Sequence, residues 1–143
     1  MNEYPPVFVD SVHLIALFVE RDQWRSASLA AARDIQDRHR YASDGIIQEF
    51  LAHVSRHGAG ARVEAARLVR DLRRDRTATV IRHSDRLIEH GLGLYDGEFR
   101  FTSLSLQDCI TIQIMRDRDI TDILTADQEF ALAGMTPLLR RYI

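Results

Sequence analysis

The sequence predicts one α/β domain, residues 1–143, with a mostly parallel central sheet. Its 143 residues match the size of a single domain with one hydrophobic core. Short apolar or β-branched runs alternate along the chain with longer stretches of helical periodicity, which is typical of parallel α/β sheets. Acidic residues follow the first and the last central run, at the sheet edge where such folds bind ligands.

Four runs are predicted as strands. Val7–Val9 is apolar throughout, as expected of a strand that is buried on both faces. The second strand is short, at 41–42, the third is β-branched, at 77–81, and the fourth is apolar, at 120–125. Residues 98–103 alternate aromatic and polar side chains, which predicts an additional strand or hairpin.

Helices are predicted between these strands from apolar spacing and from capping residues. Ser84 and Ser105 are expected N-caps, and Ser43 or Asp44 caps the helix that ends at His57-Gly58. The predicted helices cover 14–18, 22–38, 44–57, 62–74, 84–92 and 105–116, and a short one follows the last strand. The helix at 62–74 is expected to bury Val63, Ala66, Val69 and Leu72.

Charges are segregated along the chain, although the total is only −2. Residues 56–76 contain seven arginines and three acids, a net of +4, whereas 85–129 contain ten acids and four arginines, a net of −6. All 19 basic residues are arginine. Coding bias in a GC-rich genome explains the missing lysine at least as well as phosphate binding does.

The cellular setting is predicted by exclusion. A single cysteine, Cys109, cannot form an internal disulfide and fits a reducing compartment. The first residues lack the basic region of a signal peptide. No apolar run approaches the roughly 18 residues that span a bilayer. We therefore expect a cytoplasmic protein without membrane contact.

Four acids stand in settings that suggest a metal site. Asp10 ends the first strand, Glu49 lies within a helix, Asp108 lies in the first turn of another helix, and Asp127 follows the last strand. Converging carboxylates repel each other and normally need a cation. Oxygen ligands with little histidine or cysteine suit Mg²⁺ or Mn²⁺.

Four motifs containing these acids resemble, in order and spacing, those of PIN-domain proteins, and most closely VapC-type toxins of type II toxin–antitoxin pairs. The likeness spans about residues 7–139. The motifs are Val7-Phe8-Val9-Asp10-Ser11, Ser43-Asp44-Gly45-Ile46-Ile47-Gln48-Glu49, Leu106-Gln107-Asp108-Cys109 and Ile123-Leu124-Thr125-Ala126-Asp127-Gln128-Glu129-Phe130.

The resemblance implies a three-layer α/β/α PIN-like domain and a Mg²⁺- or Mn²⁺-dependent endoribonuclease, a hydrolase of RNA phosphodiester bonds. It also implies a homodimer and a VapB-like antitoxin that covers the site. The catalytic residues it implies are Asp10, Glu49, Asp108 and Asp127, with Asp10 and Asp108 as metal ligands, Glu49 and Asp127 joining directly or through water, and Ser11 and Thr125 in support.

Two departures from the family pattern concern its finer features. The run Asp10-Ser11-Val12-His13 has an imidazole where the family often has a second small polar residue. The 98–103 insertion lengthens the segment before Asp108 and is expected to affect RNA selection or antitoxin contact.

Alternative functions stay open. A PIN-like RNA-processing nuclease without an antitoxin, or a non-catalytic PIN-like module, would share the same motifs. Phosphatases and receiver domains with a nucleophilic aspartate are disfavoured, because Asp10-Ser11-Val12 lacks a second aspartate and the chain lacks lysine. The arginines at 67, 70, 73 and 74 are expected either to bind RNA phosphates or to form a solvated helix face with pairs such as Arg67–Asp71. The candidates for RNA contact are Arg67, Arg70, Arg73 and Arg74.

Overall fold

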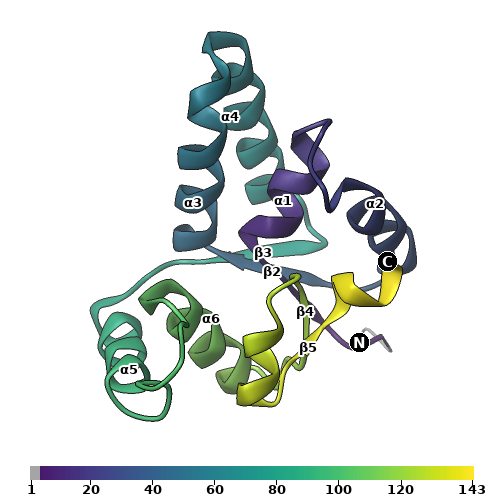
Figure 1. The fold of residues 1–143 in the computed structure, drawn as a ribbon. Helices are drawn as coiled ribbons and strands as arrows, with labels where there is room; N and C mark the ends of the chain where they lie inside the picture. The colour runs from purple at the N-terminus through teal and green to yellow at the C-terminus, as the bar shows by residue number, and fades with distance from the viewer. Residues whose placement is uncertain (1–3) are drawn as a thin grey trace.

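The computed structural model describes residues 4–143 and contains a five-stranded, all-parallel sheet between layers of helices (Figure 1). The sheet order is β3-β2-β1-β4-β5, so β1 is central and β3 and β5 form the edges. The strands are β1 (Val7–Val9), β2 (Arg40–Ser43), β3 (Ala78–Ile81), β4 (Asp122–Leu124) and β5 (Thr136–Pro137).

Helices cover both faces of this sheet, with α1, α3 and α4 on one side and α5 and α6 on the other (Figure 1). They are α1 (Ser11–Phe18), α2 (Arg25–Asp34), α3 (Asp44–Val54), α4 (Ala59–Arg74), α5 (Asp85–Tyr95) and α6 (Leu106–Asp117), with short 3-10 helices η1 (Ser55–His57), η2 (Gln128–Ala133) and η3 (Leu138–Tyr142). The predicted three-layer α/β/α architecture is confirmed. No helix among residues 4–143 is long and apolar enough to cross a membrane.

The predicted caps act as N-caps through their hydroxyl groups. Ser84 accepts a hydrogen bond from the Leu87 N–H at 3.1 Å, and Ser43 caps α3 in preference to Asp44. Ser105 forms a reciprocal capping box with Asp108 at the start of α6. This box fixes the position of the Asp108 side chain in the first turn.

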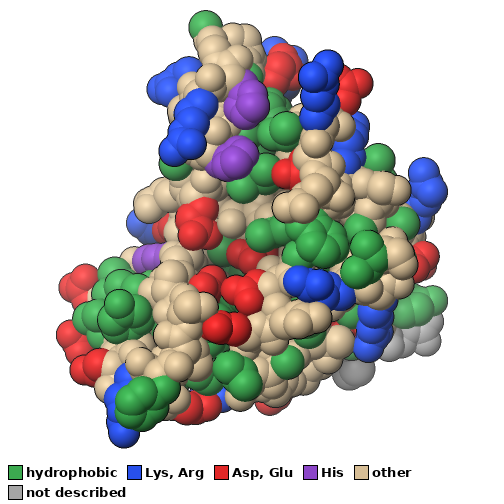
Figure 2. Space-filling model, in the orientation of Figure 1, with side chains coloured by type: hydrophobic (Ala, Val, Ile, Leu, Met, Phe, Trp, Pro, Cys, Tyr) green, Lys and Arg blue, Asp and Glu red, His purple; other side chains and the backbone are tan. Residues whose placement is uncertain are grey.

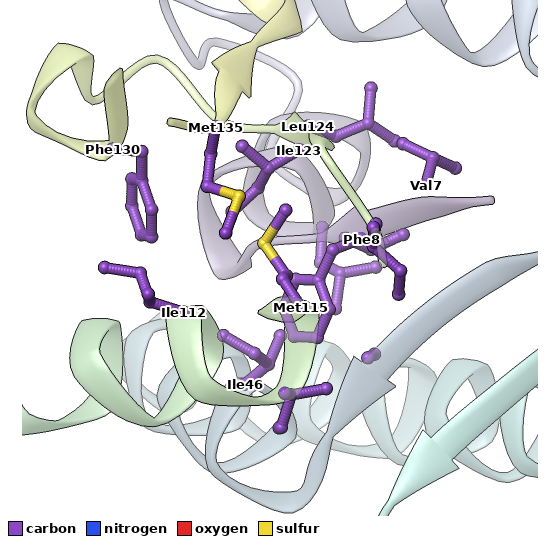
Figure 3. Close-up of a cluster of buried hydrophobic side chains, with 14 of the residues drawn as sticks. Val7, Phe8, Ile46, Ile112, Met115, Ile123, Leu124, Phe130 and Met135 are labelled. Atoms are coloured by element: carbon purple, nitrogen blue, oxygen red, sulfur yellow. The ribbon is translucent and has the colours of Figure 1, made fainter. Parts of the chain in front are cut away.

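The hydrophobic core lies on both faces of β1 and β4. Phe8 and Ile123 are fully buried, and side chains from helices on either side pack against these strands (Figure 3). Burying a large apolar side chain contributes about 1.5–3 kcal/mol. This packing holds the carboxyl ends of β1 and β4 in place beside each other.

Residues 98–103 do not form the predicted strand or hairpin. Successive turn hydrogen bonds curl the chain, including Phe99 N–H to Leu94 O at 2.9 Å and Thr102 N–H to Phe99 O at 3.1 Å. Phe99 is buried under Arg116 of α6, whereas Phe101 is 88% exposed. The alternation in sequence therefore reflects one inward and one outward ring in a turn.

Two helix predictions were also wrong in detail. The predicted helix at 22–38 is shorter, because α2 spans Arg25–Asp34. In the Arg-rich helix, Ala65 and Val69 are buried, whereas Val63 is 59% exposed. α4 packs on α3, β3 and η1 and buries a narrow stripe with i, i+4 spacing. The short strand β5 was not predicted, because two residues carry no periodic pattern.

Candidate active site

The four predicted acids meet at the carboxyl edge of the sheet. Asp10 follows β1 and caps α1, Glu49 projects from α3, Asp108 lies in the first turn of α6, and Asp127 follows β4. Charge on Asp108 and Glu49 raises the pKa of Asp10, and charge on Asp127 raises that of Asp108. Figure 2 shows acidic side chains gathered near the centre of the visible face, below the α3–α4 pair.

Asp10 is the most buried of these acids, at 5% exposure. Its Oδ1 accepts a hydrogen bond from the Ser11 N–H at 2.8 Å, and its Oδ2 accepts one from the Thr125 hydroxyl at 2.7 Å. Burial is the largest cause that raises the pKa of Asp10 from 3.8 to about 7, and the neighbouring acids add to it, while both hydrogen bonds oppose it. Asp10 forms no ion pair with any residue in the described part of the chain.

Asp108 and Glu49 are held by short-range hydrogen bonds. Asp108 Oδ2 accepts from the Ser105 N–H at 2.9 Å as part of the capping box. Burial raises the pKa of Asp108 and of Glu49, while a hydrogen bond from the Ser11 side chain lowers that of Glu49. Ser11 and Thr125 therefore both contact acids of the predicted set.

A fifth acid, Glu129, borders the site and was missed by the sequence reasoning. Its charge raises the pKa of Asp108, and its own N–H donates to Asp127 Oδ1 at 2.9 Å. The Glu129 carboxylate accepts from the Ser103 N–H at 3.0 Å and from the Ser103 hydroxyl at 2.8 Å. The only sequence signal for Glu129 was its position two residues after Asp127. No sequence signal pointed to Ser103 as its partner.

The donor set fits a hard divalent cation, but the site is not arranged as a finished metal centre. All five acids offer carboxylate oxygens, the ligands that Mg²⁺ and Mn²⁺ prefer. Among residues 4–143, however, no group of three or more His, Cys, Asp or Glu side chains is arranged to hold a metal ion. Like charges repel each other, and each carboxylate keeps its own hydrogen-bond donors. Binding a cation would therefore require the carboxylates to move closer together.

His13 and Cys109 are buried side chains that do not belong to the acid set. His13 is 4% exposed, and its Nδ1 has no hydrogen-bond partner within the described residues. Burial is the main cause that lowers the pKa of His13 to about 4, and Arg40 contributes. His13 is therefore a neutral core residue. Cys109 is a buried free thiol.

A solved structure with a similar fold is the crystal structure of VapC20 from Mycobacterium tuberculosis, a sarcin–ricin loop cleaving toxin. It is 21% identical, the TM-score is 0.78, and the match covers 91% of this chain and 96% of that chain. This chain has the PIN-like fold. No protein-family model matches the chain, and neither does the sequence of any curated protein. At this level of identity the likeness shows the fold of the chain and does not show its activity.

Proposed function

We propose that this protein is a metal-dependent endoribonuclease and the toxin of a type II toxin–antitoxin pair. The observation that carries the proposal is the buried Asp10 carboxylate, which faces other acids at the carboxyl edge of the sheet without a basic partner in the described residues. A cation would offset this repulsion. The fold likeness to a toxin that cleaves the sarcin–ricin loop supports RNA as the substrate.

In this proposal Asp10 and Asp108 hold Mg²⁺ or Mn²⁺, and Glu49 and Asp127 join directly or through water. When bound, the ion lowers the pKa of a water and offsets charge on the phosphodiester. Thr125 and the Ser11 N–H orient the two oxygens of Asp10. The Ser105 capping box does the same for Asp108.

Cleavage of defined RNAs tests this proposal. The purified protein is incubated with a synthetic hairpin that carries the sarcin–ricin loop and, separately, with a tRNA pool, in Mg²⁺, in Mn²⁺ or in EDTA. We expect internal cleavage that EDTA stops, and a loss of about 100-fold or more in Asp10→Asn and Asp108→Asn, because each removes a metal ligand. Asp71→Asn, at an exposed acid of α4, is the matched control and should cleave normally.

Full activity in Asp10→Asn or Asp108→Asn would overturn the assigned site. RNA binding without cleavage in any divalent ion would favour the non-catalytic PIN-like module. These outcomes are distinguishable because binding and cleavage are measured separately.

The antitoxin, the homodimer and the cytoplasmic location belong to the same proposal. If the gene immediately upstream encodes a short DNA-binding protein, co-expression should yield a complex in which RNA cleavage is inhibited. A solitary gene and an active enzyme would instead favour the RNA-processing nuclease. Light scattering on the purified protein tests the homodimer directly.

A further inference from the structure

We propose that an arginine-lined groove along the edge strand β3 binds the sugar–phosphate backbone of single-stranded RNA outside the acidic site. The groove consists of two adjoining hollows, of about 740 Å³ and about 540 Å³. Its basic side chains are Arg73, Arg82, Arg86 and Arg118. This inference rests on the proposed function, because it assigns a binding surface for the proposed substrate.

The two hollows lie on opposite faces of the sheet and meet at one residue of its edge. Arg82, directly after β3, lines both of them. The larger hollow lies on the α3–α4 side and includes Arg73, whereas the smaller lies on the α5–α6 side and includes Arg86 and Arg118. Since β3 has a strand neighbour only at β2, its outer edge lies open between them.

The larger hollow is lined in part by α3, the helix that also carries Glu49. Gln48, which lines the larger hollow, directly precedes Glu49 on α3. Asp44 Oδ1 accepts from Arg73 Nη2 at 3.2 Å, and its Oδ2 accepts from the His83 N–H at 3.2 Å. One side chain of α3 thus ties together α4 and the segment after β3, which form opposite sides of the path.

Three of the groove arginines are not held in ion pairs, although one acid, Asp117, lines the smaller hollow with them. Arg82, Arg86 and Arg118 form no ion pair with any residue from 4 to 143, although five other arginines do. The Arg118 guanidinium lies 6.0 Å from the centre of the Tyr41 ring, which leaves its N–H groups available. Planar guanidinium groups suit phosphate oxygens.

The acidic site itself makes such a surface necessary. Carboxylates of Asp10, Glu49, Asp108, Asp127 and Glu129 repel a polyanion, and a divalent cation offsets only part of their charge. Affinity for RNA must therefore come from positive charge elsewhere. The arginines that line the two hollows supply it.

An acidic peptide added as a sixth strand fits this edge less well. β3 is four residues long, and the Ala78 N–H already donates to Asp75 O at 3.3 Å, so the free backbone ladder is short. The helix-borne candidates Arg67, Arg70 and Arg74 do not line either hollow, and Arg67 pairs with Glu64 at 3.1 Å rather than with Asp71. Of the four arginines that the sequence predicts to contact RNA, only Arg73 lines one of the hollows.

The test measures binding of a fluorescein-labelled, 20-nucleotide single-stranded RNA of mixed sequence by anisotropy, in EDTA, over a range of salt concentrations. The variant Arg82→Gln/Arg86→Gln/Arg118→Gln is compared with Arg67→Gln/Arg70→Gln/Arg74→Gln, which removes the same charge from α4. We expect the groove variant to bind at least about tenfold more weakly. Its slope of log affinity against log salt should fall by about 2, since each lost phosphate contact contributes about 0.7.

Equal effects of the two triple variants, or none in either, would overturn the proposal. A groove variant that keeps RNA binding but loses binding of a poly-glutamate peptide would overturn it in favour of an acidic partner. Because EDTA removes cleavage from the measurement, a chain that binds RNA through the groove yet never cleaves it would refute only the proposed function. Circular dichroism on both triple variants checks that they are folded.

Discussion

Replacing Asp10 by asparagine should stabilise the metal-free protein above neutral pH, although Asp10 is the centre of the candidate site. The carboxyl group is buried, and burial together with the charges of Asp108 and Glu49 raises its pKa to about 7. Asparagine has nearly the same shape but no charge. The substitution therefore removes a buried charge that the fold accommodates at a cost.

The expected size follows from the pKa of Asp10. Because the folded-state pKa of about 7 exceeds the ordinary 3.8, protonation of Asp10 favours the folded protein, and this contribution to the free energy of unfolding is fully present below pH 3.8. It is lost as the pH rises through about 7. The difference corresponds to about 4 kcal/mol, at about 1.4 kcal/mol per pKa unit. Asparagine disturbs the hydrogen bond from Thr125, at a cost of about 1 kcal/mol. We expect a net gain of about 3 kcal/mol at pH 8 and a net loss of about 1 kcal/mol at pH 4.

Urea denaturation in EDTA at pH 4, 6 and 8 measures this gain, with Asp71→Asn as the exposed control. Adding Mg²⁺ should raise the midpoint of the wild type more than that of Asp10→Asn, which lacks the charged ligand. The reasoning is wrong if Asp10→Asn is no more stable than the wild type at pH 8, or if its advantage does not change with pH.

Three further substitutions probe the surroundings of the site. Thr125→Val removes the 2.7 Å hydrogen bond to Asp10 and should lower the free energy of unfolding at pH 8 by about 2 kcal/mol, measured in urea, with a smaller loss at pH 4. Gly45→Ala places a Cβ 1.7 Å from Gln107 Oε1 and 2.6 Å from His83 Cε1, so both side chains must shift, and loss of the 3.2 Å hydrogen bond from the Gly45 N–H to His83 Nε2 should cost about 1 kcal/mol; an unchanged thermal midpoint would contradict this. The depressed pKa of His13 makes protonation favour the unfolded chain, so the free energy of unfolding of the wild type should fall by about 3 kcal/mol as the pH falls from 6.5 to about 4. His13→Leu should remove this loss, measured in urea at several pH values. Matching pH profiles of wild type and His13→Leu would show that His13 protonates within the fold.

The fold was predictable wherever local pattern and burial agree. Val7–Val9 is apolar throughout because helices cover both faces of β1, and the acids that follow the strands fall at one edge because all strands are parallel. The 98–103 segment misled because Phe99 and Phe101 alternate without any strand beside them. An alternating pattern indicates which side chains are buried. A segment with such a pattern forms a β-strand only when another strand lies beside it.

The four acids and their contacts with Ser11 and Thr125 could be anticipated from the motifs, whereas the contact that holds Glu129 could not. Asp10 and Thr125 are 115 residues apart in sequence, yet the motif of each could be read separately. The contact of Glu129 with Ser103 depends on how the α5–α6 connection curls, which no local pattern records. Likewise, the groove arginines come from three separate segments, so the run of arginines in α4 indicated only one of them, Arg73.

The two proposals assign separate tasks to an acidic and a basic surface, and these surfaces do not follow the charge segregation in sequence, because Arg86 and Arg118 lie within the acid-rich residues 85–129. The acids around Asp10 suit a cation and repel RNA, whereas Arg82, Arg86 and Arg118, the proposed RNA contacts, line hollows that contain neither Asp10 nor Asp108. If the proposals hold, loss of the groove arginines weakens binding of substrate and transition state alike, so KM rises while kcat changes little. Loss of Asp10 removes stabilisation made only in the transition state, so kcat falls instead. A groove variant whose kcat falls as far as that of Asp10→Asn would mean that the arginines act in the chemistry and that the two tasks are not separate.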